Sequence, residues 1–405
     1  MPHQNHSLPA LLRPIGAPYA LLMRARRCLY KSGRLAAYTL NCPTVSVGNI
    51  ALGGTGKTPL ASYLLTRAQS QGVRAVVLTR GYKGKPGSTP LLVNANTPVA
   101  ACGDEALMLA RLHPEASVFV FPQRSESARL AEQGLHPGLC ILDDGMQHLA
   151  VNRDINIVLL RPDDLGADWG RVLPSGPWRE GVSALNDASA FAVKVSGDSL
   201  FTAEDAARHR LARYGKPVFF FRIKPLGLRP LFPPEPTEKE ADQDAVSGAN
   251  PGIQADRATN AQHDNFRLPP LLAPERYFDS PYILVSGVGN PAGVARTARQ
   301  IIGREPVQHF DFADHHAYTA KDLQAVCKLS AAPLPLVCTP KDAVKLAAFR
   351  EVLGATPVRV LETTPEFTSR LFTESDFDAW WDAAYTQTLA GKTARQASTA
   401  PEHTN

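Results

Sequence analysis

Short apolar runs rich in β-branched residues recur along the first half of the chain, and the gaps between them are long enough for a helix. Strands buried on both faces are almost continuously apolar, because helices cover both sides of a parallel sheet. The pattern therefore predicts parallel strands that alternate with helices. The expected strands are 44–50, 74–79, 118–121, 139–142, 155–160, 191–195 and 218–223.

The same pattern returns after residue 280 and predicts a second, smaller α/β lobe. Strands are expected there at 282–286, 307–310, 336–339 and 358–361, with helices over 291–302 and 320–329.

A segment of different composition separates the two lobes. Residues 226–280 have Pro-rich ends around an acidic middle with almost no large apolar side chains. Such a segment cannot bury enough apolar surface to offset the entropy of ordering it, so a disordered insertion is predicted. The expected organisation is a basic arm at 1–40, a core at 41–225, the insertion at 226–280, a second lobe at 281–388 and a flexible tail at 389–405.

Length and composition agree with two domains in a chain of 405 residues, of which 44% are hydrophobic. The net charge of +5 is too small to indicate a nucleic-acid binder. Six cations and no acid lie in residues 1–40, so all the net positive charge is in this arm. The six cysteines are scattered without a C-x-x-C pair and are expected to be reduced thiols of a cytosolic protein. No secretory signal or run of ~20 apolar residues is present, which predicts a soluble or peripheral protein.

The strongest local motif is S-V-G-N-I-A-L-G-G-T-G-K-T-P at 46–59, between an expected strand and an expected helix. Small residues let backbone N–H groups face phosphate oxygens, a lysine reaches the β- and γ-phosphates, and a hydroxyl binds Mg²⁺. The strict pattern has glycine at position 51, where this chain has Ala51. A chance Gly-rich turn is the competing interpretation. The predicted nucleotide-binding residues are Gly53, Gly54, Thr55, Gly56, Lys57 and Thr58.

A second element of a nucleotide site follows the expected strand 139–142. Asp143 and Asp144 come directly after four apolar residues, and Gly145 permits a sharp turn. Adjacent acids at a strand end are often only a helix cap and a solvated charge, but beside a phosphate loop they predict a Mg²⁺ site. The chain has no Asn/Thr-Lys-x-Asp element for reading guanine, which disfavours a regulatory GTPase.

Several further polar blocks follow in order, and each by itself also has a purely structural explanation as a cap, a surface ion pair or a solvated loop. They are T-R-G-Y at 79–82, G-D-E at 103–105, P-Q-R at 122–124, G-R-V-L-P-S-G-P-W-R-E at 170–180, S-G-V-G-N-P at 286–291 and F-A-D-H-H-A-Y-T at 312–319.

Together and in this order, these blocks resemble the tetraacyldisaccharide 4′-kinase family of lipid A biosynthesis. Its motifs are G-G-x-G-K-T-P, R-G-Y, G-D-E, D-D-G-F-Q-H, L-P-x-G-P-x-R-E, D-H and K-D-A-V-K, all found between Val47 and Lys345. Two departures are Met146, where the family usually has Phe, and the long insertion. The fold class implied is α/β, a P-loop NTPase-like parallel sheet with helices on both faces plus the second lobe.

The resemblance implies a kinase that uses ATP and Mg²⁺ to phosphorylate the 4′-hydroxyl of a tetraacyl glucosamine disaccharide 1-phosphate, forming the lipid A precursor lipid IVA. It implies Asp104 as the base for that hydroxyl, tuned by His315 rather than His316, and Lys57 on the phosphates. Thr58, Glu105 and Asp144 would surround Mg²⁺. The residues implied to line the substrate pocket are Arg80, Tyr82, Arg124, Asp143, His148, Arg179 and Glu180.

The basic arm fits a peripheral location at the cytoplasmic face of the inner membrane. A helix over 19–34 would hold Leu21, Leu22 and Leu29 mostly apart from its cations, as in helices that lie on anionic lipid. The alternative is a helix packed on the protein with solvated arginines. The expected partners are the acylated disaccharide and an anionic membrane surface; no nucleic acid is expected, and the sequence indicates no protein partner.

Two other functions use the same phosphate loop. A P-loop ATPase that acts as a nucleotide-gated assembly factor needs no sugar-lipid acceptor, and a soluble small-molecule kinase leaves the basic arm unexplained.

Overall fold

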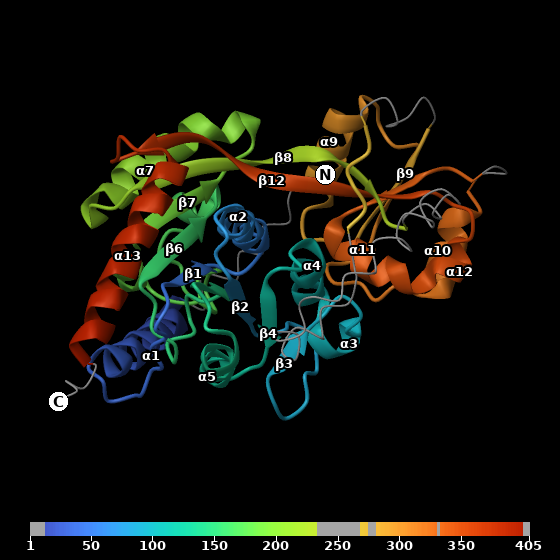
Figure 1. Cartoon of the computed structure of the whole chain (residues 1–405). Helices are drawn as coiled ribbons and strands as arrows, with labels where there is room; N and C mark the ends of the chain where they lie inside the picture. The colour runs from blue at the N-terminus through green and yellow to red at the C-terminus, as the bar shows by residue number, and fades with distance from the viewer. Residues whose placement is uncertain (1–12, 233–267, 274–280, 330–332, 400–405) are drawn as a thin grey trace, which may run out of the picture.

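The computed structural model describes residues 13–232, 268–273, 281–329 and 333–399 (Figure 1). Their strands join in one 12-stranded sheet with the order β10-β9-β11-β12-β8-β7-β6-β1-β5-β2-β4-β3. The strands are β1 (Thr44–Asn49), β2 (Ala75–Thr79), β3 (Leu91–Val93), β4 (Ser117–Val120), β5 (Leu139–Asp143), β6 (Ile155–Leu160), β7 (Ala190–Lys194), β8 (Val218–Pro230), β9 (Ile283–Ser286), β10 (Gln308–Asp311), β11 (Leu336–Cys338) and β12 (Val358–Leu371).

Helices connect most of these strands and cover both faces of the sheet. They are α1 (Arg13–Lys31), α2 (Lys57–Ser70), α3 (Val99–Cys102), α4 (Asp104–Leu112), α5 (Arg124–Leu135), α6 (Pro162–Leu165), α7 (Leu200–Leu211), α9 (Pro291–Ile302), α10 (Ala320–Cys327), α11 (Pro340–Leu346), α12 (Arg350–Leu353) and α13 (Phe377–Thr399).

Successive side chains of the core strands point to opposite faces, and different helices bury each face. Val77 of β2 belongs to the core that α2, α4 and α13 cover. Its neighbour Leu78 packs with α5, and Val158 of β6 packs with α7. All six residues of β1 and all six of β6 are buried, as strands covered by helices on both faces require. The α/β fold class predicted from the sequence is confirmed.

Two long strands carry the sheet from the core into the second lobe. β8 and β12 are antiparallel and paired from Val218 with Leu371 to Pro230 with Arg359. The first part of β8 is parallel to β7, whereas the first part of β12 is parallel to β11. Figure 1 shows this pair crossing between the two halves of the molecule. Both strands are longer than the expected 218–223 and 358–361, because each serves two lobes.

The antiparallel pairing of β8 with β12 reverses the direction of the strands in the second lobe. Strands β9, β10 and β11 run parallel to β12, and therefore opposite to β8 and to the core strands other than β3, which is antiparallel to β4. The carboxyl ends of the second-lobe strands consequently point back toward the carboxyl ends of the core strands. Loops from both edges can meet in one place.

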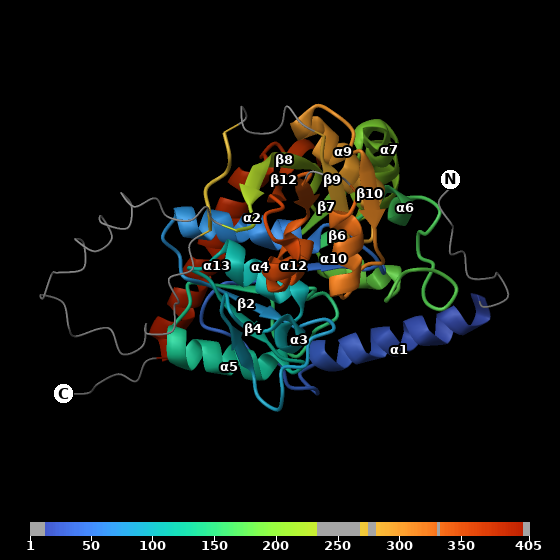
Figure 2. The same cartoon turned by 90° about the vertical axis from the view of Figure 1, so that its right-hand side faces the viewer.

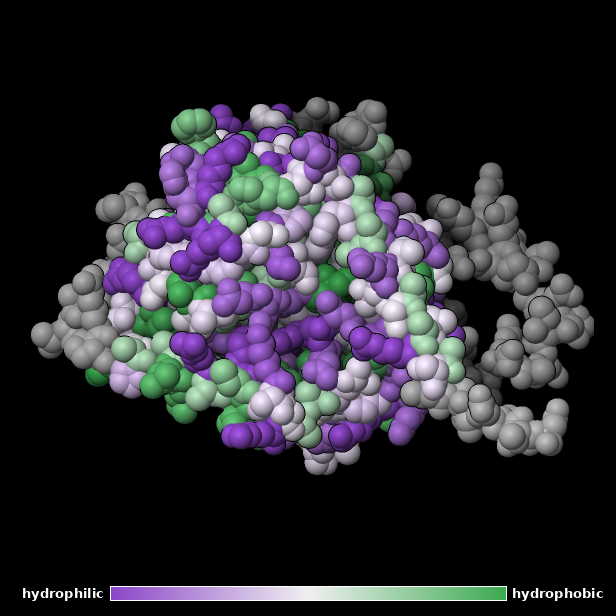
Figure 3. All heavy atoms as spheres, turned by 90° about the vertical axis from the view of Figure 1, so that its left-hand side faces the viewer, coloured by the Kyte–Doolittle hydropathy of each residue, from purple (hydrophilic) through white to green (hydrophobic). Residues whose placement is uncertain are grey.

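The C-terminal segment differs from the expected flexible tail at 389–405. Helix α13 continues to Thr399, and Figure 1 shows it along the left side of the molecule. Its Lys392 is buried, donates to the carbonyl of Leu40 at 2.8 Å and pairs with Asp154 at 3.0 Å. These contacts hold the polar end of the helix in place, whereas Phe377 and Trp381 near its start pack into the core. Figure 3 accordingly shows hydrophilic side chains across the middle of this side of the molecule.

Most of the predicted insertion, 226–280, lies outside the described residues, although 226–230 belong to β8. The boundaries expected for the other segments stay predictions. Among the described residues, no helix is both long and apolar enough to cross a membrane.

We expect Lys392→Met to lower the free energy of unfolding by about 1–3 kcal/mol, because it removes a buried hydrogen bond and an ion pair. Chemical denaturation would measure the change. Gln387→Met, at an exposed position of the same helix, is the matched control and should change stability by less than about 0.5 kcal/mol. Equal stability of the two variants would show that Lys392 does not anchor α13.

Candidate active site

The phosphate loop connects β1 to α2. Two of its glycines have a positive φ, Gly53 at 107° and Gly56 at 91°. A Cβ atom on Gly56 would lie 3.2 Å from the ring of Phe221, so a side chain would be both strained and crowded there. Ala51 is fully buried and forms a β-bridge with Trp178. It has no positive φ, so the turn does not need the usual glycine at this position.

Lys57, the first residue of α2, lies among the polar groups of the loop. Its Nζ donates to Oδ1 of Asn49 at 3.1 Å and lies 3.8 Å from Oδ1 of Asp144. The N-terminus of a helix attracts anions through its free N–H groups and its dipole. The loop therefore offers a lysine, a helix N-terminus and the neighbouring hydroxyl of Thr58 at one point.

Asp144 follows β5 and has a φ of 49°, a left-handed conformation that costs energy for a non-glycine residue. Arg179 donates to both of its carboxylate oxygens, at 3.0 and 3.1 Å. Burial opposes ionisation of Asp144, but Lys57 and Arg179 outweigh it and lower the pKa of this carboxyl group. Asp144 is therefore an anion held between two cations.

Asp143 is fully buried in a different environment. Burial, together with the charges of Glu105 and Asp144, raises the pKa of Asp143 to about 7. Its Oδ1 has no hydrogen-bond partner in the part of the chain that the structure describes. This electrostatic coupling also shows that the G-D-E block lies near the pair of acids at the end of β5.

Asp104 is the first residue of α4, and the preceding Gly103 has a φ of 83°. A Cβ atom on Gly103 would lie 2.6 Å from the carbonyl oxygen of Tyr82, so only glycine allows this close approach. The turn brings the G-D-E block against the R-G-Y block at the end of β2.

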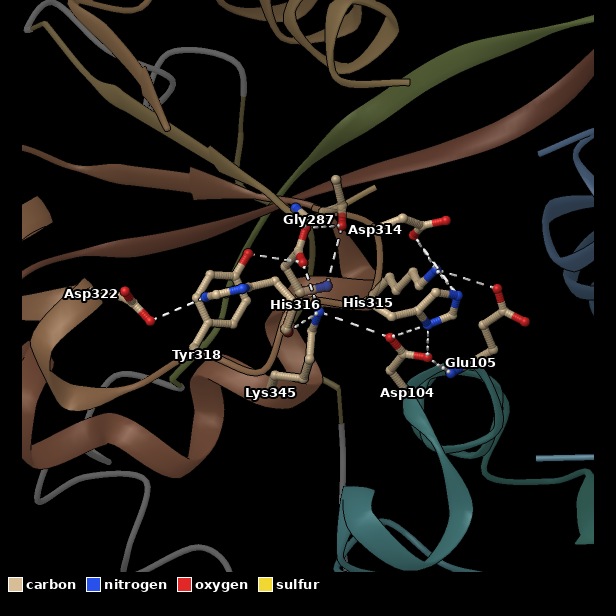
Figure 4. A network of polar contacts seen from close by, with 12 residues as sticks. Asp104, Glu105, Gly287, Asp314, His315, His316, Tyr318, Asp322 and Lys345 are labelled. Atoms are coloured by element: carbon tan, nitrogen blue, oxygen red, sulfur yellow. Dashed lines mark hydrogen bonds and ion pairs between the residues drawn. The ribbon is translucent and has the colours of Figure 1, made fainter. Parts of the chain in front are cut away.

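The carboxylate of Asp104 contacts His315 from the second lobe, 211 residues away (Figure 4). Nδ1 of His315 lies 2.9 and 3.0 Å from the two carboxylate oxygens, and both side chains are largely buried. His315 has a φ of 61°, which is another non-glycine residue in the left-handed region. The facing carboxyl edges of the two lobes therefore meet in a carboxylate–imidazole pair.

The neighbouring histidine has a different position. Nε2 of His316 lies 3.1 Å from Asp322, and its ring stacks on Phe312 with centroids 4.5 Å apart. Figure 4 shows the two histidines with their rings directed to opposite sides. His315, and not His316, is therefore the histidine that contacts Asp104.

Two lysines of α11 complete the surroundings of Asp104. Nζ of Lys345 lies 3.8 Å from Oδ2 of Asp104 and 3.1 Å from Asp342, and Lys341 lies on the far side of His315. Burial opposes ionisation of Asp104, but the His315 hydrogen bond and the two lysine charges outweigh it and lower the pKa of Asp104. The carboxylate is therefore ionised at neutral pH.

The residues predicted to line the substrate pocket differ in their contacts and exposure. Arg124 donates to the carbonyl of Asp144 at 3.0 Å, and Arg179 holds the carboxylate of the same residue. Tyr82 is 62% exposed, and its ring lies 4.8 Å from that of His315. Burial and nearby arginines, which include Arg124 and Arg80, lower the pKa of His148 to about 3.

Glu180 has a structural contact that its predicted pocket role did not anticipate. It is 3% exposed and accepts two hydrogen bonds from Nη2 and one from Nε of Arg27 in α1, at 2.7 to 3.0 Å. Arg27 also pairs with Asp187 at 2.7 Å. Glu180 therefore anchors the basic helix beside Arg179, its neighbour in sequence.

Sequence reasoning assigned no role to four polar residues that contact the site. Asn49 and Gln147 lie inside the quoted motifs, and Gln147 accepts from Arg179 at 3.0 Å. Lys341 and Lys345 belong to the K-D-A-V-K motif. This motif was the sequence signal from which their place in the site could have been predicted.

The residues around the acids suit Mg²⁺ as kinases bind it. Mg²⁺ keeps several waters and takes one or two carboxylates plus phosphate oxygens, so a complete protein cage is not expected. The described residues contain no group of three or more His, Cys, Asp and Glu that could hold a metal. They do provide the hydroxyl of Thr58 and the half-exposed carboxylates of Glu105 and Asp144. Thr58 is itself nearly buried.

Comparisons with known proteins agree with this arrangement. A family model described as Tetraacyldisaccharide-1-P 4′-kinase matches residues 8–378. The chain belongs to this family. Tetraacyldisaccharide 4′-kinases of Oleidesulfovibrio alaskensis and Nitratidesulfovibrio vulgaris are 44% and 42% identical to it. The first alignment covers 95% of this chain and 97% of the relative, and the second covers 94% of each.

A crystal structure of LpxK from Aquifex aeolicus in complex with ATP shares the fold, with a TM-score of 0.65 and 24% identity over 94% of this chain and 99% of the other. Family membership makes the chain a phosphotransferase that acts on an alcohol group, the 4′-kinase of lipid A biosynthesis, with ATP and Mg²⁺. The expected kinase is confirmed, and the alternative of a nucleotide-gated assembly factor is not supported.

We expect Arg27→Met to destabilise the kinase by about 3–5 kcal/mol, because it leaves the buried carboxylate of Glu180 unpaired. Thermal or chemical unfolding would detect the loss. Arg24→Met removes an exposed cation from the same helix and should leave stability almost unchanged. Similar unfolding curves for the two variants would contradict an anchoring role of Arg27.

Proposed function

We propose that Asp104 is the general base of the 4′-kinase and that His315 positions and tunes it. The observation that carries this proposal is the contact of 2.9 Å between the buried carboxylate of Asp104 and Nδ1 of His315. A base must be ionised and must lie near the hydroxyl that it deprotonates. Asp104 meets the first condition through its lowered pKa, and the neighbouring Glu105 is close enough to Asp143 to raise the pKa of that residue.

The nucleotide would lie on the phosphate loop, with Lys57 on the β- and γ-phosphates. Thr58, Glu105 and Asp144 would hold Mg²⁺, which neutralises charge on the transferred phosphoryl group. Asp144 is paired with Arg179 and Lys57. Both cations therefore lie beside the residues that would hold the phosphates and Mg²⁺.

The disaccharide would enter beside Tyr82, whose exposed ring lies against His315. Arg80, Arg124 and Arg179 would provide positive charge for the phosphates on this side of the sheet. Asp143, which is buried, and His148, which is partly buried, would be polar neighbours. The individual contacts of these residues with sugar or nucleotide are part of the proposal. Glu180 would act indirectly, by fixing α1 next to Arg179.

We also propose that the kinase works at the cytoplasmic face of the inner membrane, with α1 on the lipid surface. Figure 2 shows α1 along the outside of the molecule. Its exposed apolar residues include Ile15, Leu21 and Leu22, which are 54%, 67% and 65% exposed. Lys31 adds an exposed cation, although it also pairs with Asp187. An acylated substrate that stays in the bilayer would then meet the site beside Arg179.

We expect Asp104→Asn to lower kcat by about 100- to 10,000-fold, the range associated with loss of a general base. Transfer of labelled γ-phosphate from ATP to a tetraacyldisaccharide 1-phosphate in mixed micelles would measure it. His315→Gln should lower kcat by at least about 10-fold, whereas the adjacent His316→Gln should stay within about threefold of the wild type. Full activity of Asp104→Asn would refute the proposed base, and equal losses in the two histidine variants would refute the specific role of His315.

We expect the double variant Leu21→Ser/Leu22→Ser to bind anionic vesicles at least about 10-fold more weakly than the wild type, because it removes apolar area from the lipid-facing side. Flotation with phosphatidylglycerol-containing vesicles would measure binding. Phe201→Ser removes a side chain that is 82% exposed on α7 and serves as the control. Unchanged binding of the double variant would exclude α1 as the lipid contact.

A further inference from the structure

Lys341, at the start of α11, contacts three polar groups of the site from one position. Its Nζ lies 2.9 Å from Oδ1 of Asp314, 3.0 Å from Nε2 of His315 and 3.5 Å from Oε1 of Glu105. The side chain is only 14% exposed. One ammonium group therefore joins the loop after β10 to the start of α4 in the core, next to Asp104.

The contacts on the two ring nitrogens of His315 determine where its proton lies. A lysine ammonium has three donors and no acceptor, whereas an ionised carboxylate only accepts. Nε2 faces Lys341 and must accept, while Nδ1 faces both oxygens of Asp104 and must donate. The arrangement satisfies both contacts only when the imidazole is neutral with its proton on Nδ1.

Other charged or polar groups around the ring agree with this tautomer. Asp314 lies 3.8 Å from Nε2, but Lys341 is closer to both Nε2 and Asp314. The Tyr82 ring packs on the imidazole and makes no demand on its nitrogens. Lys345 approaches Asp104 from the side of α11, one helical turn after Lys341.

We propose that Lys341 is a positioning residue of the 4′-kinase, which holds His315 in the Nδ1–H tautomer so that the ring donates its hydrogen bond to Asp104. The proposal rests on the role of Asp104 as the base. Without the donor at Nε2, the ring can take its proton on Nε2 and turn toward Asp314. Asp104 then loses the hydrogen bond from His315 and its fixed orientation toward the acceptor hydroxyl, and keeps only the one from the backbone N–H of Glu105.

Because the ring has two distinguishable nitrogens, the tautomer can be measured without catalysis. The full chain labelled with ¹⁵N-histidine is compared with His315→Gln, which identifies the signals of His315 in long-range ¹H–¹⁵N spectra. We expect a protonated Nδ1 and an unprotonated Nε2 in the wild type. Lys341→Met should shift His315 toward the Nε2–H tautomer, whereas Lys321→Met, at an exposed position of α10, should leave it unchanged.

The kinetic expectation is a selective loss in kcat. Lys341→Met should lower kcat by roughly 10- to 100-fold through misplacement of the base, with KM for ATP within about twofold of the wild type. Lys341→Arg keeps a cationic donor and should recover kcat to within about fivefold of the wild type. If Lys341→Met does not fold, Lys341→Ala replaces it, because it also removes the donor at Nε2 and should give the same shift toward the Nε2–H tautomer.

A wild-type His315 protonated on Nε2 would overturn the proposal, and so would an unchanged tautomer in Lys341→Met. A lower kcat in Lys341→Met with no change at His315 would likewise overturn it. Failure of the proposed base is distinguishable, because Asp104→Asn would then keep its activity while the wild-type His315 signals remained those of the Nδ1–H tautomer.

Discussion

The reversal of direction between β8 and β12 is the constraint on which the site depends. In a parallel sheet, functional loops collect at the carboxyl edge. A second parallel block that continued in the same direction would present its loops beside those of the core. The antiparallel pair instead turns the second block around, so its loops face the core loops across the site. His315 and α11 can therefore reach α4, and neither lobe alone contains both members of the Asp104–His315 pair.

Both lobes contribute charged side chains to the site. The core supplies Asp143, Asp144 and Glu105, and their mutual repulsion is part of why the pKa of Asp143 is raised. Balancing cations come from Lys57 and Arg179 in the core and from Lys341 at the second lobe. The contact of α11 with α4 thus places Lys341 beside Glu105, where its charge partly neutralises acids that would otherwise repel the nucleotide phosphates.

Much of the fold could be predicted because continuous apolar strands such as Ile155–Leu160 leave a clear pattern. Lys57 and Asp144 could be found because a phosphate loop and a strand-end acid have local signatures. The full length of β8 and β12 could not be predicted. After Phe221, exposed and partly buried residues alternate along β8, so the sequence there lacks the continuous apolar pattern of a buried strand. The α13 extension depends on Lys392, whose partners are far away in sequence. The Asp104–His315 pairing came from family resemblance, because residues 211 apart leave no local sign of contact.

The ion pair between Arg27 and Glu180 joins positions separated by 153 residues in the sequence and lies almost out of reach of solvent. Without Arg27, the buried carboxylate of Glu180 would lose the hydrogen bonds that it accepts from this residue, so a change at Arg27 alone lowers the free energy of unfolding, while a joint change to an apolar pair is tolerable. Evolution can thus alter this contact only through paired substitutions. Among relatives, the two positions should accordingly vary together, and a chain that has lost both charges should attach its first helix by packing alone.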